Sequence, residues 1–86
     1  MEYSAKIVIG LRPSVLDPAG TAVESSLHQL GYEDVARVRI GKHVTLTLQA
    51  ENEAEAEQKV QRMCEQLLAN PTIETYKITL QQMATA

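Results

Sequence analysis

Several residue types are scarce in this chain, and each shortage excludes a class of protein. The single cysteine, Cys64, cannot form an internal disulfide. Three tyrosines are the only aromatic residues, so the stacking platforms that bind single-stranded nucleic acid are not expected. Eight basic residues against eleven acidic ones give a formal net charge of −3, a poor match to a phosphate backbone. We therefore predict no nucleic-acid partner.

Long apolar runs are also missing. No stretch approaches the roughly 20 apolar residues that span a membrane, and the first six residues lack the pattern of a secretory signal. We predict no membrane partner and a cytoplasmic location. With 86 residues, the chain is expected to be a single domain, 1–86, ordered over about 2–80 with a frayed tail at 81–86. A domain this small buries only about 60% of its unfolded surface, so self-association is expected.

Alternation and turn residues predict the first two elements. Apolar and polar residues alternate over Tyr3–Leu11, which indicates a half-buried strand. Over Pro18–Leu30 the apolar residues recur every three or four positions, which indicates a helix. Asp17 is suited to cap its start and Gly31 to end it, because Asp accepts the free amide hydrogens and Gly tolerates the left-handed conformation.

The middle of the chain predicts a hairpin. Val35–Ile40 forms a second strand, in which Val38 and Ile40 face one way and the arginines Arg37 and Arg39 the other. Gly41-Lys42 is suited to a two-residue type II′ turn, and His43–Ala50 alternates as a third strand.

The last third predicts one helix and one strand. Asn52 is a helix cap with Glu55 three residues later, and the helix that it begins ends before Asn70-Pro71. Thr75–Leu80 alternates as a fourth strand. The order β-α-β-β-α-β predicts an α+β, ferredoxin-like (split βαβ) fold, with two helices on one face of an antiparallel sheet.

The other face of this sheet is polar and rich in threonine. It is either a solvated face or a subunit interface, and the sequence leaves both open. Its predicted members are Ser4, Lys6, Val8, Arg37, Arg39, His43, Thr45, Thr47, Thr75, Lys77 and Thr79.

No group of residues has the spacing of a catalytic or metal site. Cys64 lies in the apolar stripe of the second helix and is expected to be a buried small hydrophobe. The two histidines share no segment with it, and the glutamates at 51–57 are explained as charges at a helix start. Asp17 would occupy the amides with which the first helix could bind an anion. Arg12 is either an anion contact or a solvated strand end. We predict no catalytic, cofactor-binding or metal residue.

Motifs along nearly the whole chain, from about Tyr3 to Leu80, resemble one family. They are Pro13-Ser14-Val15-Leu16-Asp17-Pro18-Ala19-Gly20, Val23-Glu24, Leu27-His28, Leu30-Gly31-Tyr32, Val38-Arg39-Ile40-Gly41-Lys42, Met63-Cys64-Glu65, Leu67-Leu68-Ala69-Asn70-Pro71, Ile73-Glu74 and Tyr76. The family is PurS, the small subunit of phosphoribosylformylglycinamidine synthase.

The resemblance implies a subunit without a catalytic site of its own in an ATP- and glutamine-dependent ligase, which performs the fourth step of de novo purine biosynthesis. It would bridge a glutaminase subunit and a larger synthetase subunit and assist the transfer of ammonia to formylglycinamide ribonucleotide. ATP and Mg²⁺ would bind to the complex, with no cofactor on this chain. A homodimer or higher homo-oligomer is expected.

Exposure and turn residues suggest where such a subunit contacts other proteins. The expected interface residues are Arg12, Asp17, Arg37, Arg39, Lys42, His43 and Asn70. The alternative function is a ferredoxin-like regulatory domain that senses a small ligand, which would require a polar pocket at a dimer seam.

Overall fold

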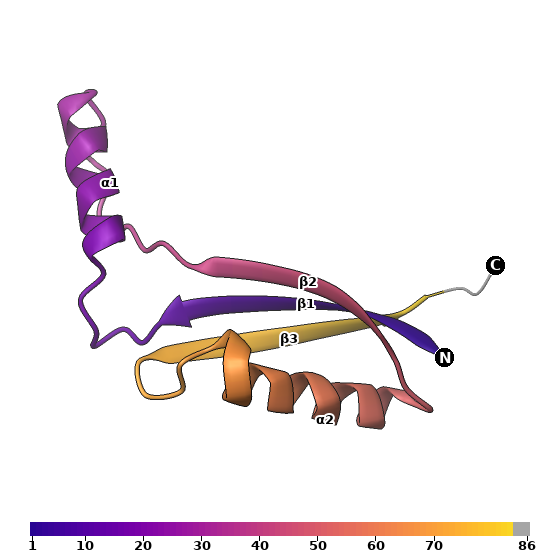
Figure 1. The fold of residues 1–86 in the computed structure, drawn as a ribbon. Coiled ribbons are helices and arrows are strands. Elements are labelled where there is room, and N and C mark those ends of the chain that lie inside the picture. The colour runs from indigo at the N-terminus through magenta and orange to yellow at the C-terminus, as the bar shows by residue number, and fades with distance from the viewer. Residues whose placement is uncertain (84–86) are drawn as a thin grey trace.

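Three strands form one antiparallel sheet in a computed structural model, which describes residues 1–83 (Figure 1). The central strand is β1 (Glu2–Leu11), flanked by β2 (Lys42–Gln49) and β3 (Glu74–Gln82). Because successive side chains of a strand point to opposite faces, the alternating sequences separate an apolar face from a polar face.

One helix covers the apolar face and the other leaves it. Helix α2 (Glu53–Met63) continues into a π-helical segment, η1 (Cys64–Leu68), and packs across β3 and β1. Helix α1 (Pro18–Gln29) projects beyond the end of the sheet where β1 stops (Figure 1). We call residues 12–41, which contain α1 and the segment returning from it, the arm.

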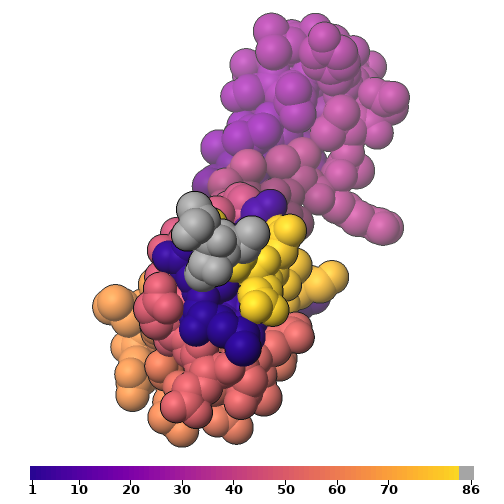
Figure 2. All heavy atoms as spheres, turned by 90° about the vertical axis from the view of Figure 1, so that its right-hand side faces the viewer, coloured from indigo at the N-terminus to yellow at the C-terminus, as the bar shows by residue number. Residues whose placement is uncertain are grey.

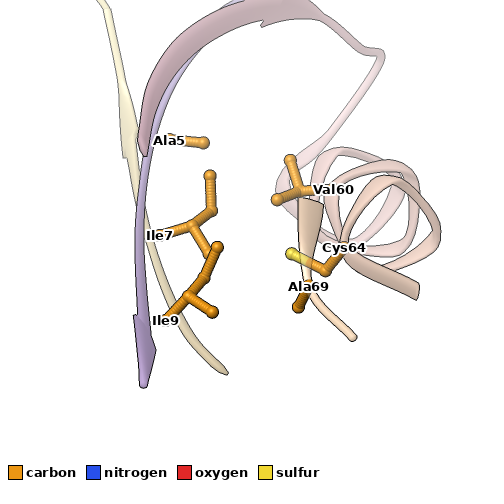
Figure 3. Close-up of a cluster of buried hydrophobic side chains, with 6 residues drawn as sticks. All are labelled: Ala5, Ile7, Ile9, Val60, Cys64 and Ala69. Carbon is orange, nitrogen blue, oxygen red and sulfur yellow. The ribbon is translucent and has the colours of Figure 1, made fainter. Parts of the chain in front are cut away.

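The core lies between β1 and α2. Ile7 is fully buried opposite Val44 of β2 and Ile78 of β3. Cys64 is fully buried as well, which confirms the prediction that it is a core residue; burial, together with the charge of Glu65, raises the pKa of its thiol. Figure 3 shows the two sides of this cluster, which are Ala5, Ile7 and Ile9 of the strand and Val60, Cys64 and Ala69 opposite them.

The predicted strand over Val35–Ile40 is wrong for the single chain, because this segment is irregular. Arg37 has φ of 58°, a left-handed conformation that interrupts an extended strand. The predicted two-residue hairpin would also pair Ile40 with His43 and place Ile40 on the polar face. Gly41 also lacks the positive φ that a type II′ turn needs at this position, so the predicted hairpin turn does not form. In the described residues β2 pairs with β1.

The α+β class with an antiparallel sheet is confirmed and is consistent with a ferredoxin-like fold. The placement of two helices on one face is wrong within one chain, because α1 is bonded to the segment 38–40 and stays with it beyond the sheet. The tail also differs from the prediction. Strand β3 continues to Gln82, because the first residues of β1 pair with Gln81 and Gln82. The prediction that the chain frays from Gln81 is therefore wrong for these two residues. Residues 84–86 lie outside the described part.

A candidate protein-binding surface at the base of the arm

Arg12 connects the arm to the loop before β3. Its Nη2 donates to the carbonyl of Pro71 at 2.7 Å, and its amide donates to the carbonyl of Ile73 at 2.8 Å. Nη2 of Arg39 in turn donates to the carbonyls of Arg12 and Val15, both at 3.0 Å. A guanidinium can hold several acceptors in one plane, so these contacts tie three separate segments together.

Asp17 holds the start of α1 against the returning segment. Its Oδ1 accepts from the Gly20 amide at 2.9 Å, which confirms the predicted helix cap, and its Oδ2 accepts from the Ile40 amide at 2.8 Å. Asp17 is only 4% exposed. These two hydrogen bonds, with the charge of Arg39 as a smaller contribution, lower the pKa of the carboxyl below its ordinary 3.8.

Asp17 is expected to make the stability of the protein depend on pH. A lowered folded-state pKa means that the ionised group stabilises the fold above the ordinary value of 3.8, and that this stabilisation is lost as pH falls through the folded pKa. Below about pH 4, the free energy of unfolding measured in urea should fall less steeply with pH in Asp17→Asn than in wild type. Asp34→Asn, which changes an exposed carboxylate in the same arm, is the control. An identical acid dependence in wild type and Asp17→Asn would contradict this role.

Lys42 and Asn70 meet through Glu74. The Nζ atom of Lys42 lies 3.5 Å from Oε2 of Glu74, and Oε1 of the same carboxylate accepts from the Asn70 amide at 2.7 Å. Oδ1 of Asn70 accepts from the Thr72 amide at 3.1 Å and closes the turn. The loop after η1 is therefore held to the first residue of β2.

Arg37 and His43 lie at the same end of the sheet without joining these hydrogen bonds in the described residues. His43 is exposed on β2, opposite Val8 of β1. Arg37 lines a groove of about 500 Å³ between the arm and the sheet, together with Val8, Pro13, Arg39 and Ile40. All seven predicted interface residues thus lie around the end of the sheet where the arm joins it. We call this region the base of the arm.

Two further residues that hold this surface together were not predicted from the sequence. The carboxylate of Glu24 accepts from the Val38 amide at 3.2 Å. A Cβ atom at Gly20 would lie 2.2 Å from the Val38 carbonyl oxygen, so only glycine permits this approach. A glycine in the first turn of a predicted helix is a visible signal, because glycine is otherwise costly there.

The surface has side chains of the kinds that protein interfaces use. It combines arginines with an exposed apolar floor in which Val8 is 58% exposed. Among residues 1–83, no three or more His, Cys, Asp or Glu side chains are grouped so that they could hold a metal ion. In the same residues, no helix combines the length and apolar character needed to cross a membrane.

Comparison with known proteins identifies the family of this chain. Residues 4–82 match the family model PurS, described as phosphoribosylformylglycinamidine (FGAM) synthase. The chain is 61% identical over 74 residues to the phosphoribosylformylglycinamidine synthase subunit PurS of Synechocystis, covering 86% of this chain and 74% of that one. It is 41% identical to the subunit PurS of Bacillus subtilis over 94% of this chain and 95% of the relative.

Solved structures share the fold over the same length. A structure of PurLQS from Thermotoga maritima contains a chain that superposes with a TM-score of 0.86 at 32% identity, over 94% of this chain and 99% of that one. The Bacillus subtilis PurS structure gives a TM-score of 0.85 at 41% identity, over 93% and 99%. Because the family model matches residues 4–82 and both named relatives exceed 30% identity over 74% or more of their own length, the chain belongs to the PurS family.

Proposed function

We propose that this chain is the non-catalytic small subunit of phosphoribosylformylglycinamidine synthase and bridges the glutaminase and synthetase subunits during de novo purine synthesis. The observation that carries the proposal is the match to PurS over residues 4–82. A structural relative, PurLQS from Thermotoga maritima, supports a role within an assembly. In this proposal ATP and Mg²⁺ bind to the other subunits, and the complex works in the cytoplasm.

The physical advantage of bridging is confinement of ammonia. Ammonia released into bulk water is protonated and diluted before it meets the activated amide. A bridge that keeps the releasing and consuming sites in one complex turns this encounter into an intramolecular event with a high effective concentration. The bridge itself needs binding surfaces and no catalytic side chain.

The base of the arm is the proposed contact surface. Three segments far apart in sequence meet there and are fastened by Arg12, Arg39 and the pair Lys42–Glu74. A surface fixed before binding loses little conformational freedom when a partner docks, which favours affinity. The exposed Arg37 and Val8 offer the charge and the apolar area that protein interfaces use.

Turnover with two nitrogen donors tests bridging. Glutaminase and synthetase subunits are mixed with and without this chain, and product formation is measured with glutamine or with ammonium. We expect the chain to raise glutamine-driven turnover on the order of 100-fold, because only that route depends on effective concentration. Ammonium-driven turnover should change little. Equal glutamine-driven rates with and without the chain would refute bridging.

A matched pair of variants tests whether the base of the arm is the contact surface. Arg37→Ala removes an exposed arginine at the base of the arm, and Arg62→Ala removes an exposed arginine from α2. Arg37→Ala should raise the concentration of chain needed for half-maximal glutamine-driven turnover, whereas Arg62→Ala should not. The regulatory-domain alternative is not favoured, because the relatives are PurS subunits.

A further inference from the structure

Neither helix covers the polar face of the sheet within residues 1–83. Helix α2 packs on the opposite, apolar face, and Figure 2 shows the arm standing apart from the sheet layer. The exposed side chains of the polar face come from all three strands. They are Lys6 and Val8 of β1, His43, Thr45 and Thr47 of β2, and Thr75, Lys77 and Thr79 of β3.

Two lysines are close neighbours at the centre of this face. Lys6 lies opposite Thr79 and Val8 lies opposite Lys77, so the two lysines are diagonal neighbours on adjacent strands. Such positions are about 7–8 Å apart, which long side chains can span. Like charges in neighbouring positions of a sheet repel each other, and an anionic partner that lies against both ammonium groups would relieve this repulsion.

The part of the chain that the structure describes supplies no carboxylate partner for these two lysines. Of the four lysines in the sequence, Lys42 and Lys59 form salt bridges, at 3.5 Å and 3.1 Å. Lys6 and Lys77 form none within residues 1–83. In the described strands the only acidic residue on this face is Glu2, at its far end. A chain with more acidic than basic residues therefore presents a basic sheet face.

The layer on the other side of the sheet is acidic. Residues 51–68 contain five glutamates against Lys59 and Arg62. This separation of charge determines which occupant fits the polar face. A second copy placed face to face would set lysines against lysines, and like charges across an interface are costly. A copy that offered its acidic layer would make a head-to-tail contact, which grows into open chains unless the rotation closes a ring. The occupant that fits is a different protein with an acidic surface.

The polar face is continuous with the base of the arm. Val8 is 58% exposed between the two regions, and it also lines the groove in which Arg37 lies. The threonines beside Val8 and Lys6 add methyl groups and hydroxyls that can contact a protein without burying a charge. One partner surface can therefore lie against the groove and the sheet together.

We propose that the polar face docks on a carboxylate-rich surface of a different protein, with Lys6 and Lys77 at the centre of the contact and Arg37 at its edge. Exposed lysines steer the approach of an acidic partner, and Val8 with its threonine neighbours supplies contact area. The inference rests on the proposed function, under which the partner is the glutaminase or the synthetase subunit. It adds the sign of the charge on the partner and extends the contact from the base of the arm to the sheet.

Charge reversal on the two layers tests the proposal in the assembled enzyme. One variant carries Lys6→Glu with Lys77→Glu, and its control carries Lys59→Glu with Arg62→Glu on α2, so the net charge falls by four in both, two for each substitution. The concentration of chain needed for half-maximal glutamine-driven turnover should rise on the order of tenfold in the first variant and less than about twofold in the control. At about 1 M salt, where the screening length is about 3 Å, the two variants should become equal.

Three results would overturn the proposal. They are equal half-maximal concentrations for the two variants at low salt, a difference that survives high salt, and a changed oligomer mass of the Lys6→Glu, Lys77→Glu variant in light scattering, which would place this face in self-association. A wild-type chain that does not raise glutamine-driven turnover would refute bridging and this inference together. If wild type raises that turnover while the two variants match, bridging stands and only the acidic partner is rejected.

A second pair of variants excludes misfolding as the cause. Thr47 is exposed on the same face, opposite Ser4. Thr47→Lys adds a positive charge and should lower the half-maximal concentration about twofold, whereas Thr47→Asp should raise it by a similar factor. A gain in apparent affinity cannot come from partial unfolding. Equal half-maximal concentrations for Thr47→Lys and Thr47→Asp would show that charge on the polar face does not govern docking.

Discussion

Ile7→Ala is expected to destabilise the protein by about 3 kcal/mol, within the range of about 2–5 kcal/mol for Ile→Ala in a core. Ile7 is fully buried in the centre of β1, between its partners on β2 and β3 and beneath Val60 of α2. Such a small domain has few other core layers, so the cavity left by the missing carbons is poorly filled. For a domain of this length the melting temperature should fall by about 12–24 °C.

The neighbouring residue provides the control for this prediction. Val8 is 58% exposed on the polar face of the same strand. Val8→Ala changes strand propensity but leaves no cavity, so a loss within about 1 kcal/mol is expected. Both variants are compared by urea unfolding at one protein concentration, because self-association makes stability depend on concentration. Similar losses in the two variants would place the main core elsewhere.

Gly20→Ala is expected to separate α1 from the segment that returns beside it. The new Cβ would lie 2.2 Å from the Val38 carbonyl oxygen. That carbonyl cannot easily retreat, because the Val38 amide is bonded to Glu24 and the Ile40 amide to Asp17. Overpacking typically costs about 1–3 kcal/mol. The amides of residues 38–40 should consequently exchange with solvent faster than in wild type.

Gly10→Ala is the matched glycine control. A Cβ atom at Gly10 meets no heavy atom within 4 Å, and its φ is not positive. Alanine there restricts the unfolded chain without strain, so the expected change is a gain of about 0.4–1 kcal/mol. If Gly20→Ala were as stable as Gly10→Ala, the close approach of α1 to Val38 would be wrong.

Local patterns were sufficient for most elements of this protein. The alternation of Tyr3–Leu11 predicted β1, and the caps Asp17 and Asn52 predicted the starts of both helices. These signals act over a few residues, between a side chain and its own backbone, so they do not require knowledge of the fold. Motifs along the chain also sufficed to recognise the PurS family, which the comparisons confirmed.

The hairpin and the position of α1 could not be obtained in this way. Alternation over Val35–Ile40 indicates that the segment could be a strand, but it does not say which edge the strand would meet. Register decides that question, and a tight turn at Gly41 would have placed Ile40 on the wrong face. The seven interface residues were chosen by exposure, whereas Glu24 and Gly20 contribute through contacts with a segment 14 or more residues away.

The sequence alone therefore determined the class of fold, the helix starts, the core residue Cys64 and the family. Each of these depends on interactions between residues close in the chain, or on motifs in a specific order. The tertiary structure decided the pairing of β2 with β1, the projection of the arm, and the joining of Arg12, Arg39 and Lys42 at its base. Those features depend on contacts between residues that lie far apart in the chain, and local preferences do not encode such contacts.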